Sequence, residues 1–181
     1  MILRTDRLIM RNWKESDFDA FCDMCADKEV MKYFPNTLDR DESLLLARKI
    51  KLSIEEKGWG LWAVEIPESC DFIGFVGLHV PKDNLPFSPC IEVAWRLAKQ
   101  YWGFGYATES ALAAVHFGFS VLKLTEIVAF TSAINTPSIN VMKKIGMHNT
   151  GADFDHPEVP EASRLSRHML YRISNPEGSV I

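Results

Sequence analysis

The chain has 181 residues, of which 47% are hydrophobic and 24% charged, and it carries a formal net charge of -4. This length and composition suit one globular domain over residues 1–181 and exclude a disordered chain. The acidic balance argues against a nucleic-acid-binding protein, because a phosphate backbone needs positive charge. Four cysteines are too few for a disulfide scaffold. We find no apolar run long enough to cross a bilayer and no signal peptide, so we expect a soluble cytoplasmic protein without membrane partners.

The first third of the chain predicts one strand and two helices. Apolar residues alternate with charged ones over residues 3–11, as in a strand. Ser16 is placed to cap a helix that begins there. Asp39 and Glu42 have the spacing of a capping box before a second helix, and Gly58 is placed to end that helix.

The rest of the chain predicts six more strands and two more helices. One helix is expected over residues 106–122. Thr136 is placed as the N-cap of a short helix with Pro137 at its first position, and Gly146 is placed to end that helix. Runs rich in β-forming residues predict the strands. These strands are expected at residues 61–66, 72–80, 91–97, 126–131, 147–154 and 168–173.

The order of these elements predicts the fold class. The series β-α-α-β-β-β-α-β-α-β-β contains one strand–helix–strand crossover within a sheet of about seven strands that is otherwise antiparallel. Such an order is typical of a mixed α/β (α+β) layer fold, with helices flanking the sheet.

The most informative stretch is EVAWRLAKQYWGFGYATE, residues 92–109. It predicts a strand, a turn containing Gly103 and Gly105, and the start of a helix. Two glycines allow a tight turn and a close approach of the backbone to a ligand. The free N–H groups and the positive dipole end of the helix favour a pyrophosphate. A nucleotide-like ligand and a purely structural tight turn are both compatible with these two glycines alone.

Two other nucleotide-binding motifs can be tested on the same residues. A dinucleotide fingerprint needs a third glycine at position 108, where this chain has Thr108. A Walker A loop needs a GxxxxGK[ST] pattern, which the sequence lacks. A dehydrogenase and a P-loop protein are therefore disfavoured.

The pattern Gln100-x-x-Gly103-x-Gly105 resembles the acyl-CoA pyrophosphate loop of the GNAT N-acetyltransferase superfamily. The surrounding residues look like the RimJ/RimL-like branch of that superfamily, and NTPSINVMKKIGM at residues 135–147 matches a second motif of the branch. The entry strand and the closing strand fit as well, so the resemblance covers nearly the whole chain. It implies a twisted sheet in which two neighbouring strands splay apart at the acetyl-CoA site.

The resemblance also implies which residues hold acetyl-CoA. The strand before the turn would offer backbone groups to the pantetheine arm, the turn would hold the pyrophosphate, and the asparagine after the next strand would bond the pantetheine arm. In this sequence those residues are Trp95, Arg96, Leu97, Gln100, Gly103, Phe104, Gly105, Tyr106, Ala107, Thr108 and Asn135.

Acyl transfer from a thioester to an amine needs a base for the amine proton and a donor for the departing thiolate. By resemblance, Glu92 is the candidate base and Ser138 the candidate donor. Both residues also have a non-catalytic interpretation. Glu92 would then be a solvent-facing carboxylate on a strand, and Ser138 would be a first-turn residue that satisfies backbone N–H groups of its helix. Many relatives carry a tyrosine acid at a position that here is Met142, which cannot donate a proton.

Other chemistry-bearing residues carry less weight. His79 and His156 are alternative bases. Cys22 and Cys25 share the apolar face of the first helix, which favours core packing over redox or metal chemistry, and we expect no metal site.

The acceptor is an amine, either a small molecule or a protein N-terminus. Trp59, residues 33–36 and residues 154–160 are expected to wall the acceptor site, and the acidic balance favours a cationic acceptor. We expect a monomer or a homodimer. A non-catalytic module that binds acyl-CoA on the same fold is the alternative function.

Overall fold

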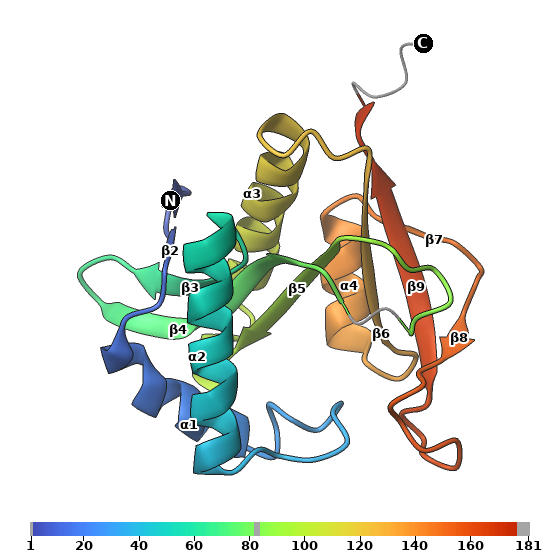
Figure 1. Ribbon diagram of the computed structural model, residues 1–181, viewed down its shortest axis with the longest axis horizontal. Coiled ribbons are helices and arrows are strands. Elements are labelled where there is room, and N and C mark those ends of the chain that lie inside the picture. The colour runs from blue at the N-terminus through green and yellow to red at the C-terminus, as the bar shows by residue number, and fades with distance from the viewer. Residues whose placement is uncertain (1, 82–83, 177–181) are drawn as a thin grey trace.

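The computed structural model describes residues 2–81 and 84–176. Its strands form one sheet in the order β1-β2-β3-β4-β5-β6-β9-β7, with β8 also paired to β9 (Figure 1). The strands are β1 (Leu3–Arg4), β2 (Ile9–Arg11), β3 (Leu61–Ile66), β4 (Cys70–His79), β5 (Glu92–Leu97), β6 (Glu126–Ser132), β7 (His148–Asn149), β8 (Phe154–Asp155) and β9 (Arg167–Ser174). The helices are α1 (Phe18–Ala26), α2 (Arg40–Lys57), α3 (Tyr106–Ser120) and α4 (Thr136–Lys144), with short 3-10 turns η1 (Glu15–Asp17) and η2 (Lys99–Tyr101).

Strand pairing confirms the predicted mixed, mostly antiparallel sheet. Among the described strands, only β5 and β6 pair in parallel, and α3 connects them as the crossover. The other pairs along the sheet are antiparallel. The described sheet counts nine strands, against about seven expected from the sequence, because it includes several pieces of two residues.

The two faces of the sheet are covered by different helices. Trp62 of β3 packs edge-on against Phe117 of α3, with ring centroids 5.3 Å apart. Phe75 of β4 lies on the other face, where its ring is 6.1 Å from that of Phe21 of α1. Because side chains alternate along a strand, each residue of β4 and β5 can be assigned to the α1 face or to the α3 face.

Local signals explain where most elements begin and end. Asp39 and Glu42 form the predicted capping box of α2, and Gly58 ends that helix in a left-handed conformation with φ 77°. The predicted bounds of β3 match those observed.

Four boundary predictions were wrong. The strand expected over residues 3–11 is divided into β1 and β2, because the chain turns where the Thr5 backbone N–H bonds the Leu8 carbonyl. Ser16 lies inside the 3-10 turn η1, so α1 begins only at Phe18. Asn135, not Thr136, caps α4 by accepting from the Ser138 N–H. The strand expected over residues 147–154 forms only the pairs of β7 and β8, separated by a turn at Gly151.

Within residues 2–81 and 84–176, no helix is long and apolar enough to cross a membrane.

Candidate active site

The site begins where β5 and β6 separate. Glu92 and Val128 are the one residue pair that joins these strands in the sheet, and beyond it the strands diverge (Figure 1). The opposite edge of β5 pairs with β4 over its whole length, from Glu92 to Leu97. The edge of β5 that faces β6 therefore offers backbone N–H and C=O groups to an extended ligand lying between the strands.

The glycine turn follows directly at the end of β5. Gly103 and Gly105 have φ angles of 84° and 83°, a conformation that favours glycine over all other residues. Gly105 caps α3, and the first hydrogen bond of that helix runs from the Glu109 N–H to the Gly105 carbonyl. The N–H groups of the first turn of α3 that precede Glu109 therefore have no carbonyl partner within the helix, which suits an anion site.

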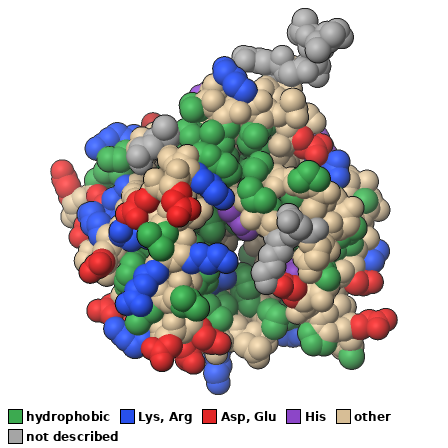
Figure 2. Space-filling view, viewed as in Figure 1, with side chains coloured by type: hydrophobic (Ala, Val, Ile, Leu, Met, Phe, Trp, Pro, Cys, Tyr) green, Lys and Arg blue, Asp and Glu red, His purple; other side chains and the backbone are tan. Residues whose placement is uncertain are grey.

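A groove of about 670 Å³ joins the splayed strands to the glycine turn. Figure 2 shows a central hollow in the surface, with histidine and hydrophobic side chains at its walls. The predicted cofactor residues that line it are Trp95, Arg96, Leu97, Gly103, Gly105, Tyr106, Ala107, Thr108 and Asn135. Gln100 and Phe104 are exposed and lie outside this lining. Contact with a cofactor stays a prediction for all of these residues.

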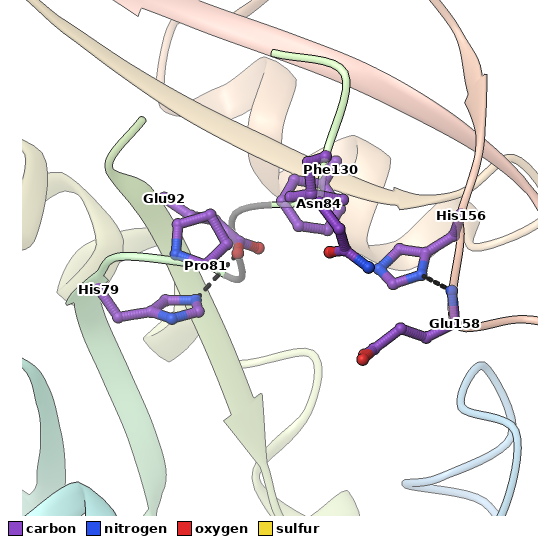
Figure 3. Close-up of a pocket in the computed structure, with 8 residues that line it drawn as sticks. His79, Pro81, Asn84, Glu92, Phe130, His156 and Glu158 are labelled. Atoms are coloured by element: carbon purple, nitrogen blue, oxygen red, sulfur yellow. Dashed lines mark hydrogen bonds and ion pairs between the residues drawn. The ribbon is translucent and has the colours of Figure 1, made fainter. Parts of the chain in front are cut away.

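Glu92 lies at the inner end of the groove and is paired with a histidine. Its side chain is 10% exposed, and one carboxylate oxygen lies 2.9 Å from Nε2 of His79 on β4 (Figure 3). Burial acts to lower the pKa of His79, but the hydrogen bond and the charge of Glu92 outweigh it, so the pKa is raised. Glu92 is therefore not the solvent-facing carboxylate that was its ordinary alternative.

Two more histidines lie across the groove from Glu92. The rings of His156 and His168 have centroids 4.8 Å apart, and both pack near Phe130 and Phe154. Nδ1 of His156 accepts from the Glu158 N–H, a bond drawn in Figure 3. Burial lowers the pKa of His168, whose Nδ1 lies 3.0 Å from the Ser166 carbonyl. The rings of Phe130 and Phe154 and the two imidazoles thus form an aromatic wall of the groove.

Asn135 and Ser138 form a small hydrogen-bonded unit at the start of α4. The Asn135 amide donates to Oγ1 of Thr131 at 2.9 Å and to Oγ of Ser138 at 3.1 Å. Because a hydroxyl can accept and donate at once, Ser138 keeps a proton that it can direct into the groove. Met142 lies behind it, buried and without a polar hydrogen.

Only some of the residues expected to wall the acceptor site line this groove. Tyr33, Phe34 and Pro35 line the groove from the segment between α1 and α2, and His156, Glu158 and Val159 line it from the opposite side. Asn36 and Trp59 do not line it. Trp59 instead lies beside α2, with the Lys57 ammonium 5.8 Å from its ring.

Arg7 supports the glycine turn and was not found from the sequence. Its guanidinium donates to the Phe104 carbonyl at 3.0 Å and to the Glu109 carboxylate at 2.7 Å, and it lies 4.8 Å from the Tyr106 ring centre. Glu109 also accepts from Thr5, and these bonds lower its pKa although burial acts to raise it. No sequence signal could join residues about a hundred positions apart.

Cys22 and Cys25 lie in the core and not at the groove. Cys22 and Cys25 are buried, unbridged and part of the α1 packing, as predicted. In the part of the chain that the structure describes, no group of three His, Cys, Asp or Glu side chains is arranged to hold a metal ion.

The structure thus combines a splayed parallel strand pair, a glycine-capped helix N-terminus and a buried carboxylate beside the gap. This is the arrangement that the sequence resemblance implies for the class of acyl-CoA-binding proteins. Comparison of the sequence with known protein families leads to the same class. Residues 7–148 match the family model described as an acetyltransferase (GNAT) domain. The chain therefore belongs to the GNAT acetyltransferase family, of the RimJ/RimL type, whose enzymes use acetyl-CoA.

Individual relatives cover most of the chain. It is 30% identical over 152 residues to the uncharacterized N-acetyltransferase YnaD of Bacillus subtilis, covering 83% of this chain and 85% of that protein. It is 28% identical over 177 residues to an FsC-acetyl coenzyme A-N(2)-transacetylase of Aspergillus fumigatus, covering 94% of this chain and 74% of the relative. A GNAT-family acetyltransferase from Bacillus anthracis superposes with a TM-score of 0.80 at 27% identity, covering 97% of this chain and 99% of that one.

Proposed function

We propose that this protein transfers an acetyl group from acetyl-CoA to the amine of a small molecule or a protein N-terminus, by direct attack in a ternary complex. The observation that carries the proposal is the pairing of Glu92 with His79 at the inner end of the groove, next to the splayed edge of β5. A carboxylate in that position can take a proton from an amine that approaches the gap.

The residues of the groove fit a bound acetyl-CoA. The backbone edge of β5 pairs with the pantetheine arm, and the turn from Gly103 to Thr108 holds the pyrophosphate. A side chain at Gly103 would meet no atom within 4 Å, so the turn is open on the side where an anion can approach. The bound group supplies the acetyl thioester, and the protein supplies position and proton transfer.

Glu92 accepts the amine proton, directly or through one water. His79 modulates the basicity of Glu92, because a protonated imidazole binds the carboxylate oxygen that would accept the proton. As pH rises through the raised pKa of His79, the imidazole loses its charge and the carboxylate becomes the stronger base. When the C–S bond of the thioester breaks, the Ser138 hydroxyl donates a hydrogen bond to the departing thiolate.

The test is the release of free thiol from acetyl-CoA in the presence of a panel of amines and N-terminal peptides. We expect release to require an amine. In Glu92→Gln, kcat/KM near neutral pH should fall by about 100-fold or more, as for loss of a general base. The acidic limb of its pH profile should flatten, and the difference from the wild type should fade at high pH, where the amine is already deprotonated.

Glu126→Gln is the matched control, because Glu126 also begins a strand but lies outside the groove, 3.3 Å from Arg172. It should keep the wild-type profile. An unaltered acidic limb in Glu92→Gln would transfer the base role to a histidine or to the amine itself. CoA binding without thiol release for any amine would leave a non-catalytic acyl-CoA-binding module.

A further inference from the structure

The face of β5 that carries Glu92 also carries a second charged side chain, Arg96. Glu92 is opposite His79 and Arg96 is opposite Phe75 in the pairing of β5 with β4, so both project to the α1 face of the sheet. Between them on this face lies only the methyl group of Ala94, which also lines the groove. One strand face thus presents a carboxylate, a small residue and a guanidinium in succession.

Aromatic rings and a thiol surround the Arg96 guanidinium. Its carbon lies 4.3 Å from the ring centre of Phe34 and 5.4 Å from that of Phe75, and Nη1 donates to the Cys25 sulfur at 3.3 Å. Nε is buried and has no hydrogen-bond partner in the described part of the chain. Nor does any carboxylate within residues 2–81 and 84–176 lie within ion-pair distance of Arg96.

Arg11, which is buried, shows how this chain surrounds a guanidinium that has a structural role. Arg11 makes two bonds to Asp17, at 2.8 Å and 2.9 Å, and one to Glu65 at 2.6 Å. Burial lowers the pKa of Arg96, where no such carboxylates offset it. A guanidinium nevertheless stays protonated at neutral pH, so Arg96 is a cation held in an apolar groove wall without a counter-charge. Such an arrangement is costly unless a ligand supplies the anion.

We propose that Arg96 binds an anionic group of the acceptor, so that the preferred substrates are amines that also carry a carboxylate several bonds away. The proposal rests on the proposed acetyl transfer, whose acceptor class it specifies. Glu92 and Arg96 are four residues apart, about 13 Å along a strand. A single carbon between amine and carboxylate, as in an α-amino acid, is too short to reach both ends.

The anion is assigned to the acceptor because of the face on which Arg96 lies. The glycine turn opens α3, which packs on the opposite face through Phe117 and Trp62. Phe34, which covers the Arg96 guanidinium, belongs to the segment between α1 and α2 that lines the groove. The local charge thus outweighs the overall acidic balance, which had favoured a cationic acceptor.

The experiment compares 6-aminohexanoate with its neutral amide, 6-aminohexanamide, as acceptors, and uses glycine as the short comparator. We expect the wild type to favour the carboxylate by about 10- to 100-fold in kcat/KM, mainly through KM, as for a charge-assisted contact. Arg96→Gln should reduce this ratio to about one. Arg96→Lys should keep part of it, since it keeps the charge but not the planar fork. Lys32→Gln is the control, because it removes a nearby exposed cation outside the groove.

Two further measurements separate the possible outcomes. Calorimetric CoA affinity should be unchanged in Arg96→Gln, and a loss of that affinity would assign Arg96 to a cofactor phosphate instead. Binding of 6-aminohexanoate and of its amide to the CoA-saturated protein reports the preference even without turnover. Equal binding of both by the wild type, or a preference that persists in folded Arg96→Gln, would overturn the proposal. Absence of transfer with the binding preference intact would overturn only the proposed function.

Discussion

At the scale of single residues, Ser138 shows how a helix cap can hold a serine hydroxyl in place. Asn135 accepts from the Ser138 N–H at 3.3 Å and donates to its Oγ at 3.1 Å. These two bonds fix the side chain at the edge of the groove. The sequence interpretation left two roles open for Ser138, as a first-turn residue and as a donor to the thiolate, and the observed geometry is compatible with both.

Ser138→Ala separates these two roles. We expect kcat to fall by about 10- to 100-fold with little change in CoA affinity, because the lost bond forms mainly in the transition state. Steady-state kinetics and calorimetry provide the two readouts. Thr136→Ala, at an exposed first-turn position of the same helix that does not line the groove, should change neither. Wild-type turnover in Ser138→Ala would leave solvent as the proton source.

Which site residues could be predicted depends on how far apart in the chain their partners lie. The glycine turn and Asn135 were found because their signals are local. The pairing of His79 with Glu92 was missed, since the segment between β4 and β5 is too long for the sequence to define the register. The side-chain contacts of Arg7 and Arg96 were also missed, because their partners are distant in the sequence. Arg7 meets Glu109, and Arg96 meets Phe34 and Cys25, only in the folded chain.

At the scale of elements, the turn between β5 and α3 depends on backbone conformation. Gly105 has φ 83°, and its nearest neighbour for an added side chain is Nη2 of Arg7 at 3.6 Å. Space is therefore sufficient, and the penalty for a larger residue is conformational.

Gly105→Val should weaken CoA binding at least tenfold in calorimetry, because the turn can no longer present its N–H groups at the start of α3. The matched control is Gly151→Val. Gly151 has φ 71° and open space around it, but lies outside the groove. That control should lose a similar stability, about 1–2 kcal/mol, and keep its CoA affinity. Equal affinity in the two variants would place the pyrophosphate elsewhere.

The elements themselves were mostly predictable, and the exceptions have physical causes. Strands and helices with a strong period and a clear cap, such as β3 and α2, have the expected bounds within a residue or two. The strand expected over residues 147–154 does not form as one element because side chains bond the backbone two residues further on. Oδ1 of Asn149 accepts from the Gly151 N–H, and Oγ1 of Thr150 accepts from the Ala152 N–H. Such local bonds compete with strand pairing and favour a turn.

At the scale of the whole molecule, one buried ionic cluster joins the N-terminal segment to the sheet. Arg11 of β2 binds Asp17 of η1 and Glu65 of β3, and it also donates to the Asp71 carbonyl of β4. Three strands and a 3-10 turn therefore share one guanidinium. Removing a partner from such a cluster leaves an uncompensated buried charge.

The cluster makes stability depend on pH in a defined direction. The Arg11 hydrogen bond lowers the pKa of Glu65 below its ordinary value of 4.5, against the effect of burial. The resulting stabilisation is fully present above that ordinary value and is lost as pH falls through the lowered pKa. Urea denaturation between pH 7 and pH 3 should therefore show a steeper loss in the wild type than in Glu65→Gln.

At pH 7, Glu65→Gln should be less stable than the wild type by about 1–3 kcal/mol, the cost of weakening a buried charged bond. Glu126→Gln provides the comparison, because its pair with Arg172 is more exposed and should contribute about 0–1 kcal/mol. Parallel pH curves for Glu65→Gln and the wild type would mean that other carboxylates control acid unfolding.

The alternation of β5 has a consequence for how such a protein can diverge. Val93, Trp95 and Leu97 face α3, while Ala94 and Arg96 face the opposite wall of the groove. A ligand that pairs with the backbone N–H and C=O groups of β5 does not depend on the identity of its side chains. Binding of such a ligand therefore tolerates substitutions on either face of the strand. With the role proposed for Arg96, single mutations at positions 94 and 96 would redirect the choice of acceptor in small steps and leave the helix-facing side of the strand unaltered.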